Sequence, residues 1–268
     1  MTRVLKVYRA ECFSPNSVER DRAIMDAVGE VLSSRGYVVD GLSETDLTAE
    51  AAADVFISMA RTPRALAVLK EKEREGCLVV NSPAGVEMCK RSVVDRLMRD
   101  NNIPAAPLDG ADGYWIKRGD EAAQQKEDVV FVADEGEKRR VLGLFAQRGI
   151  GDVVVTAHVK GDLVKFYGVT GTGFFRTFRH CANGYSKFGD EAVNGLSHGY
   201  GFPQERLQGD AERLAALAGV AVYGGDCIVR RDGSYAIIDF NDWPSFAMCR
   251  DEAAEAIAGK VVSVVCGK

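Results

Sequence analysis

Residues 225 to 244 read GDCIVRRDGSYAIIDFNDWP. Two runs rich in Ile, Val and Tyr flank a polar turn, and the Asp232-Gly233 pair suits turn positions of unusual φ, so the segment predicts a β-hairpin. Asp239 and Asn241 are two residues apart, and an extended backbone therefore places both side chains on one face. The hairpin would return Asp226 to a position beside them.

Two carboxylates and an amide oxygen, without thiol or imidazole, make a set of hard oxygen donors suited to Mg²⁺. Such a site keeps several waters and shares the ion with substrate phosphates. An Asp at a strand end also commonly caps a turn, so a purely structural turn is the competing interpretation. Ile237 and Ile238 favour the metal site, because they lead a buried strand directly into adjacent polar positions.

The same segment resembles the metal-binding end of ATP-grasp enzymes. That superfamily carries an Asp on one strand and an acidic-x-Asn followed by Pro on the next. Asp226, Asp239, Asn241 and Pro244 stand at the matching positions. The resemblance implies ATP and Mg²⁺ as cofactors, with Asp226, Asp239 and Asn241 as metal ligands.

The composition of the whole chain fits an ordinary globular protein, with 46% hydrophobic and 27% charged residues among 268. A formal net charge of −5 gives no basic surface for nucleic acid, and no apolar run approaches the ~20 residues that span a bilayer. The N-terminus enters a strand-like pattern directly, without a signal-peptide core. We therefore expect a cytoplasmic protein with no nucleic-acid or membrane partner. The seven cysteines are scattered, which argues against a disulfide framework or a zinc site.

The first 80 residues alternate between strand and helix patterns, which predicts a small parallel α/β sheet. The expected strands are 3–8, 36–40, 54–59 and 77–80, and the expected helices are 18–35 and 63–75. With the resemblance, the chain is expected to be an α/β protein with an ATP-grasp fold. Its parts would be an N-terminal Rossmann-like pre-ATP-grasp lobe (1–81), a middle lobe (82–150) and a C-terminal lobe with the metal site (151–268).

In the middle lobe, a loop is expected over 81–91, followed by a helix from Ser92 to Asp100. The resemblance implies that a basic residue opening this helix, Lys90 or Arg91, reaches the nucleotide phosphates. A solvated Lys-Arg pair is the alternative. Lys117 ends a strand and resembles the lysine that grips the α- and β-phosphates, since a strand-terminal Lys can aim its charge into a cleft.

One segment departs from the family pattern. Many ATP-grasp enzymes have a Gly-rich loop that covers the phosphates soon after this lysine. Residues 120 to 126 are instead polar and helix-prone. The phosphate contacts are therefore expected from a rebuilt loop or from elsewhere.

The strand at 153–159 corresponds, in the resemblance, to the hinge whose backbone groups read adenine. A Glu is common there, whereas this chain has Thr156, Ala157 and His158. Backbone recognition tolerates the change, because main-chain donors and acceptors do not depend on the side chain. The residues expected to bind the nucleotide, besides Lys90 or Arg91 and Lys117, are Thr156, Ala157, His158, Val159, Asp162 and Lys165.

A second hairpin is expected over 163–180, in which Lys165 and Tyr167 share one face. The segment 164–169 is similar to one in the inositol polyphosphate kinase branch of the superfamily. Arg176 and Arg179 are candidates, with Lys117, for stabilising the transferred phosphoryl group or binding the acceptor. The long loop at 181–208, with Lys187 and His198, could meet an anionic substrate or carry ordinary surface charges.

The chain is thus expected to be a Mg-ATP-dependent enzyme acting on a small molecule. A carboxylate–amine ligase that works through an acylphosphate is favoured, because it is the commonest chemistry of the superfamily. A kinase for a hydroxyl of a polyol or inositol phosphate is the alternative suggested by the 164–169 segment. A non-catalytic nucleotide-binding protein is the third. The sequence leaves the acceptor and the oligomeric state open.

Overall fold

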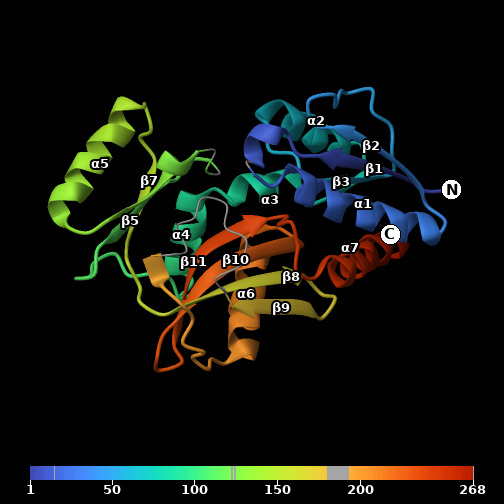
Figure 1. Cartoon of the computed structure of the whole chain (residues 1–268). Coiled ribbons are helices and arrows are strands. Elements are labelled where there is room, and N and C mark those ends of the chain that lie inside the picture. Colours follow the sequence, from blue (N-terminus) through green and yellow to red (C-terminus); the bar gives the residue numbers. More distant parts are fainter. Residues whose placement is uncertain (15, 122, 124, 180–192, 268) are drawn as a thin grey trace.

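The computed structural model describes residues 1–14, 16–121, 123, 125–179 and 193–267. Within these residues the strands form three sheets, arranged in a row from the N-terminal lobe through the C-terminal lobe to the middle lobe (Figure 1). No helix in the described part of the chain is both long and apolar enough to span a bilayer.

The N-terminal sheet is parallel, with strand order β2-β1-β3-β4, as the alternating pattern predicted. Its strands are β1 (Arg3–Tyr8), β2 (Val38–Ser43), β3 (Val55–Ser58) and β4 (Leu78–Val80). Between them run a 3₁₀ turn (Glu11–Phe13), α1 (Val18–Ser34) and α2 (Pro63–Arg74). Helix α1 forms because Ile24, Val28 and Leu32 recur on one face, and all three are fully buried.

The middle lobe contains α3 (Pro83–Met88), α4 (Arg91–Asp100), β5 (Tyr114–Arg118), β6 (Val129–Val132), α5 (Glu135–Gln147) and β7 (Val153–Ala157). Its sheet is antiparallel, in the order β6-β5-β7. Because β7 pairs with β5, this sheet extends past the lobe boundary expected at residue 150. The described residues of 120–126 contain no α-helix; a 3₁₀ turn follows at Lys126–Asp128.

Helix α3 was not expected, because the segment had been interpreted as a loop. The hydroxyl of Ser82 accepts a hydrogen bond from the backbone N–H of Gly85 at 3.0 Å, and Pro83 occupies the first helical position. Both features favour a helix start. The six-residue helix is too short to show a periodic apolar face, which is why hydrophobic spacing gave no signal.

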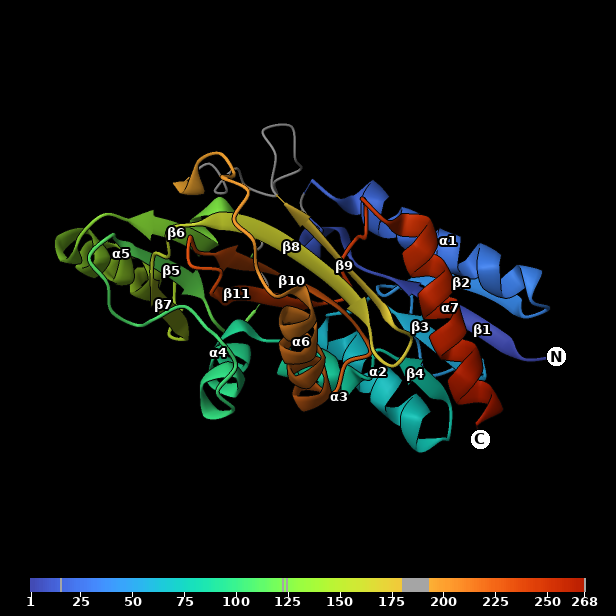
Figure 2. The same cartoon turned by 90° about the horizontal axis from the view of Figure 1, so that it is seen from below.

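The C-terminal sheet is antiparallel, with strand order β11-β10-β8-β9. It comprises β8 (Asp162–Val169), β9 (Phe174–Arg179), β10 (Val222–Val229) and β11 (Tyr235–Asp242). The hairpin predicted from residues 225–244 is confirmed, with Asp226 directly opposite Asp239. Helix α6 (Gln204–Ala218) begins within the long loop expected at 181–208 and covers one face of this sheet (Figure 2).

The last helix, α7 (Arg250–Cys266), lies along α1 rather than on the C-terminal sheet alone (Figure 2). Its buried residues Ala254, Ile257 and Val261 join a hydrophobic core that also contains Ile24 and Val28 of α1. The core of the N-terminal lobe is therefore built from both ends of the sequence.

Candidate active site

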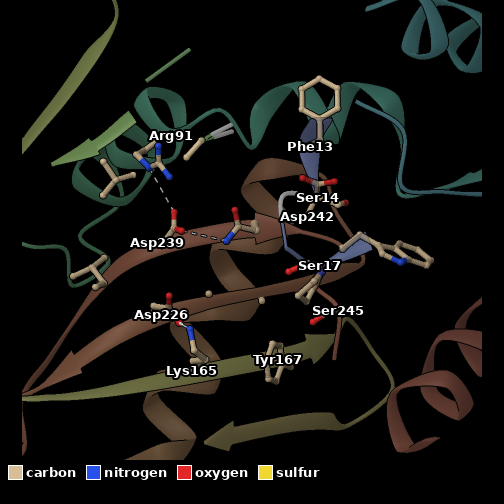
Figure 3. Close-up of a pocket in the computed structure, with 18 of the residues that line it drawn as sticks. Phe13, Ser14, Ser17, Arg91, Lys165, Tyr167, Asp226, Asp239, Asp242 and Ser245 are labelled. Atoms are coloured by element: carbon tan, nitrogen blue, oxygen red, sulfur yellow. Dashed lines mark hydrogen bonds and ion pairs between the residues drawn. The ribbon is translucent and has the colours of Figure 1, made fainter. Parts of the chain in front are cut away.

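A cavity of about 330 Å³, called here the main pocket, is lined by residues of all three lobes (Figure 3). It lies on the face of the C-terminal sheet that α6 leaves open, because Val164, Phe166 and Cys227 pack toward α6 while their neighbours face the other way. At its centre the lining residues are polar or charged: Arg91, Lys117, Lys165, Asp226, Asp239 and Asn241.

The three predicted metal ligands share one face of β10 and β11. Asp226 is opposite Asp239, and Asn241 is opposite Gly224. The side-chain nitrogen of Asn241 donates to Asp239 Oδ2 at 3.3 Å, and Lys165 Nζ lies 3.3 Å from Asp226 Oδ1 (Figure 3). The predicted convergence of these side chains is therefore present in the structure.

A β-bulge in β11 creates a further polar contact beside this group. Asp239 pairs with Asp226 and Ile237 pairs with Cys227, so Ile238 is an extra residue without a partner on β10. Lys117, only 9% exposed, donates a hydrogen bond from Nζ to the carbonyl oxygen of Ile238 at 2.8 Å. The bulge thus gives the strand-terminal lysine a fixed position in the pocket.

The charges in the pocket shift one another's protonation. Burial lowers the pKa of Lys117 to about 8, although Asp239 works in the opposite direction. Burial alone would raise the pKa of Asp239, but Arg91 and Lys117 more than offset it and hold that pKa below its usual value. Near neutral pH the pocket therefore holds a carboxylate and a protonated lysine together.

These residues fit Mg²⁺ that is shared with a phosphate ligand. The described residues hold no group of three or more His, Cys, Asp or Glu side chains that could bind a metal ion by themselves. Two carboxylates and an amide oxygen leave coordination positions for water and phosphate oxygens, which is the usual arrangement for Mg²⁺. Arg91 Nε is buried without a hydrogen-bond partner, at 3.7 Å from Asp239 Oδ1, so it has a donor available for an anion.

Apolar side chains also line the main pocket. Trp115, Val129, Leu163 and Ile238 line it, and they come from the middle and C-terminal sheets. The indole N–H of Trp115 donates to His158 Nδ1 at 3.1 Å, which fixes the ring. A flat aromatic base could lie here with its phosphates directed toward Lys117 and the carboxylates.

Solved structures with this arrangement of lobes share one fold. A D-alanine–D-alanine ligase from Bacillus anthracis, solved with ATP, matches over 98% of both chains with a TM-score of 0.68 and 13% identity. A RimK domain protein from Sphaerobacter thermophilus matches over 97% of this chain and 98% of its own, with a TM-score of 0.66 and 15% identity. Both are similar to this chain along nearly its whole length. The chain has the ATP-grasp fold.

A third structure with the ATP-grasp fold is that of the ligase PsnB with a precursor peptide and AMPPNP. It matches over 96% of both chains with a TM-score of 0.59 and 15% identity. No family model and no curated protein matches this sequence.

Within the ATP-grasp fold, the structure distinguishes between the two basic residues that the sequence left open. Arg91 lines the main pocket, and its Nη1 donates to the carbonyl oxygen of Arg118 at 2.7 Å. Lys90 is the exposed N-cap residue of α4 and lies outside the pocket lining. The geometry therefore favours Arg91 as the phosphate-binding residue.

The four residues expected to form the hinge have other contacts in the structure. The backbone N–H groups of Ala157 and His158 already donate to the carbonyl oxygens of Pro107 (2.7 Å) and Gly113 (2.8 Å). Thr156 lines a small neighbouring cavity with Arg91 and Lys117, and Val159 packs in an apolar cluster. These four residues do not line the main pocket.

Asp162, expected to bind the nucleotide, has a different set of partners. Its buried carboxylate accepts hydrogen bonds from the backbone N–H groups of His198 (2.6 Å) and Tyr200 (2.8 Å). Arg179 Nη1 donates to the same carboxylate at 2.8 Å. Asp162 is thus occupied in anchoring the segment 198–200, outside the main pocket.

The two arginines expected to be catalytic do not line the main pocket either. Arg176 shares a sheet face with Tyr167 but lies on the edge strand β9, where its Nε donates to Glu252 at 2.8 Å. Arg179 points to the opposite face, toward Asp162, because it is an odd number of residues away. Lys187 lies outside the described residues.

Sequence reasoning missed the N-terminal lobe's contribution to the pocket, which includes Arg9, Ser17 and Arg61. Arg9 follows the end of β1, and Arg61 follows the end of β3. Ligands in open α/β sheets bind outside the carboxyl ends of parallel strands. Charged residues at those two strand ends were therefore a usable signal.

Proposed function

We propose that the chain is a Mg²⁺- and ATP-dependent ligase that joins a carboxylate to an amine through an acylphosphate. The observation that carries the proposal is the convergence of Asp226, Asp239 and Asn241 opposite Lys117 and Arg91, inside an ATP-grasp fold. ATP in the solved D-alanine–D-alanine ligase, and the ligase descriptions of the other matched structures, support this choice of chemistry.

Each group in the pocket would have a defined task. Asp226, Asp239 and Asn241 would hold Mg²⁺, which neutralises phosphate charge when bound. Arg91, Lys117 and Lys165 would bind phosphate oxygens and stabilise the charge that develops during transfer. The substrate carboxylate would bond to the γ-phosphorus as the bond to ADP breaks, and the amine would then displace phosphate from the acyl carbon.

Thermal unfolding with and without Mg-ATP tests the nucleotide site. A ligand at 100 times its dissociation constant stabilises the folded state by about 2.7 kcal/mol. We expect a metal-dependent stabilisation of the wild type that Asp239→Asn loses. Asp40→Asn is the control, because Asp40 is an exposed carboxylate paired with Arg3 far from the pocket lining. A wild type that saturating Mg-ATP does not stabilise would contradict the proposal.

Product analysis then separates the ligase from the kinase alternative. Ligation of an acid and an amine releases ADP and free phosphate and forms an amide. A kinase releases ADP and a phosphoester without free phosphate. ADP released with a phosphorylated alcohol as the product would exclude the ligase chemistry while retaining the nucleotide site.

A further inference from the structure

Asp242 follows Asn241, the last predicted metal ligand, and is held by a residue of the N-terminal lobe. Strand alternation turns Asp242 away from the face occupied by Asn241. The side chain of Asp242 is completely buried, and its Oδ1 lies 2.5 Å from Nη2 of Arg61. The same nitrogen also donates to the backbone carbonyl of Asp242 at 3.3 Å. One arginine therefore holds both the side chain and the backbone of this residue (Asp242 is labelled in Figure 3).

Arg61 is itself fixed by a buried acid. Glu44 is 1% exposed, and its Oε2 accepts hydrogen bonds from the backbone N–H groups of Arg61 (2.9 Å) and Thr62 (2.7 Å). The other oxygen accepts from the backbone N–H of Ala10 at 2.6 Å. Glu44 thus ties the turn after β3 to the segment after β1, and it fixes the backbone of Arg61.

A second arginine repeats the arrangement one residue further on. Arg9 Nη2 donates to the backbone carbonyl of Trp243 at 2.9 Å, and its Nη1 donates to Asp21 at 3.0 Å. Two consecutive residues at the end of β11 are therefore held from the N-terminal lobe.

Burying ion pairs is a weak route to stability, because desolvation offsets the attraction between the charges. A role in fixing the geometry of the strand end accounts better for the buried Arg61–Asp242 pair, which lies next to the proposed metal ligand Asn241. Residues that orient metal ligands without touching the metal typically contribute 10- to 100-fold to metal affinity.

We propose that Arg61 is a positioning residue for the metal-binding end of β11. Through Asp242 it holds the backbone that presents Asn241 and Asp239, so the N-terminal lobe controls the affinity of the site for Mg²⁺. This inference rests on the proposed function, since it takes these two side chains as metal ligands.

The test compares Arg61→Met, Arg61→Lys and a matched control in the full-length chain. Arg35→Met is the control, because Arg35 of α1 pairs with Glu255 of α7 at 2.5 Å outside the pocket lining. Calorimetric titration of Mg²⁺ at fixed ATP gives the metal affinity. Hydrogen exchange of the backbone amides of residues 240–243, without metal or nucleotide, reports the order of the strand end.

We expect Arg61→Met to weaken Mg²⁺ binding by about tenfold or more and to speed the exchange of these amides. Arg61→Lys should restore part of both, since lysine can still pair with Asp242. Arg35→Met should leave both unchanged. If Arg61→Met does not fold, Asp242→Asn replaces it, because removing the charge weakens the bond to Arg61 while keeping the shape of the side chain.

A folded Arg61→Met, or Asp242→Asn in its place, with wild-type Mg²⁺ affinity and wild-type exchange would overturn the inference. That result is distinguishable from failure of the proposed function. In the latter case the wild type itself would bind no Mg-ATP. Equal effects of Arg61→Met and Arg35→Met on Mg²⁺ affinity and amide exchange would also overturn the inference. The Arg61–Asp242 pair would then have no specific role in the metal site.

Discussion

Lys117 holds its charge in a position where burial opposes ionisation. Its pKa is lowered to about 8 from an ordinary value of 10.5. The folded chain therefore releases this proton at a lower pH than the unfolded chain does. Between these two values the unfolded state binds more protons, so this group makes the nucleotide-free protein more stable as the pH rises. Phosphate binding by Lys117, in contrast, would need the protonated side chain.

We accordingly expect affinity for Mg-ATP to fall as the pH rises above about 8. If bound phosphates keep Lys117 protonated, the dissociation constant rises by up to about tenfold per pH unit. Calorimetry between pH 7 and 9 measures this. Lys117→Arg keeps its charge throughout the range and should flatten the profile. A wild-type constant that does not change with pH would contradict the assignment of Lys117 to the phosphates.

The proximity of the proposed metal ligands was predictable residue by residue, whereas the contacts that support them were not. Asp226 and Asp239 belong to one hairpin, and local pairing alone brings them together. Arg61 and Asp242 are separated by 181 positions in the sequence, and Arg9 and Trp243 by 234. No local pattern encodes such contacts, because they depend on how two lobes dock. Arg176 and Arg179 do not line the main pocket, and their partners Glu252 and Asp162 lie outside its lining as well.

Among the elements, α3 and α6 approach each other more closely than a side chain allows. A Cβ atom on Gly85 of α3 would lie 2.3 Å from the carbonyl oxygen of Gly219, which ends α6. Such a contact with backbone cannot be relieved by a change of rotamer. The small residue at position 85 therefore sets how closely these helices pack.

We expect Gly85→Ala to destabilise the protein by about 1–3 kcal/mol, the typical cost of overpacking. Gly143→Ala is the matched control: it lies in α5, where a Cβ atom would meet nothing within 4 Å. That change should stabilise by about 0.5–1 kcal/mol, since alanine favours the helix. Chemical denaturation of both variants measures the difference. Equal stabilities would show that α3 can move away from α6 without cost.

Most elements were predictable because their patterns are local, whereas the pairing of distant strands was not. The helix faces and the alternating strands follow from spacing within a few residues. The pairing of β7 with β5 depends on residues about 40 positions away, which spacing does not reveal. For the same reason, the hydrogen bonds from the backbone N–H groups of Ala157 and His158 to Pro107 and Gly113 were not expected.

At the scale of the molecule, α7 is part of the N-terminal core. Ile257 is fully buried among residues of α1 and β1. We expect Ile257→Ala to cost about 2–5 kcal/mol and to lower the stability of the N-terminal lobe, although the residue is far from it in sequence. Ser263→Ala, on an exposed part of the same helix, should change stability by less than about 0.5 kcal/mol. Thermal unfolding measures the stability of both variants, and hydrogen exchange of the β1 amides measures the stability of the N-terminal lobe. An unchanged exchange rate in β1 of Ile257→Ala would contradict the shared core.

The partnership of α1 and α7 also bears on how the chain folds as it leaves the ribosome. N-terminal domains generally fold first during synthesis. Here α1 packs on the N-terminal sheet, but its contact with α7 must wait until residues 253–261 have emerged. The middle sheet uses only residues up to 157 and can close earlier. The N-terminal lobe is therefore synthesised first but gains its contact with α7 only after the residues of the other two sheets have been made.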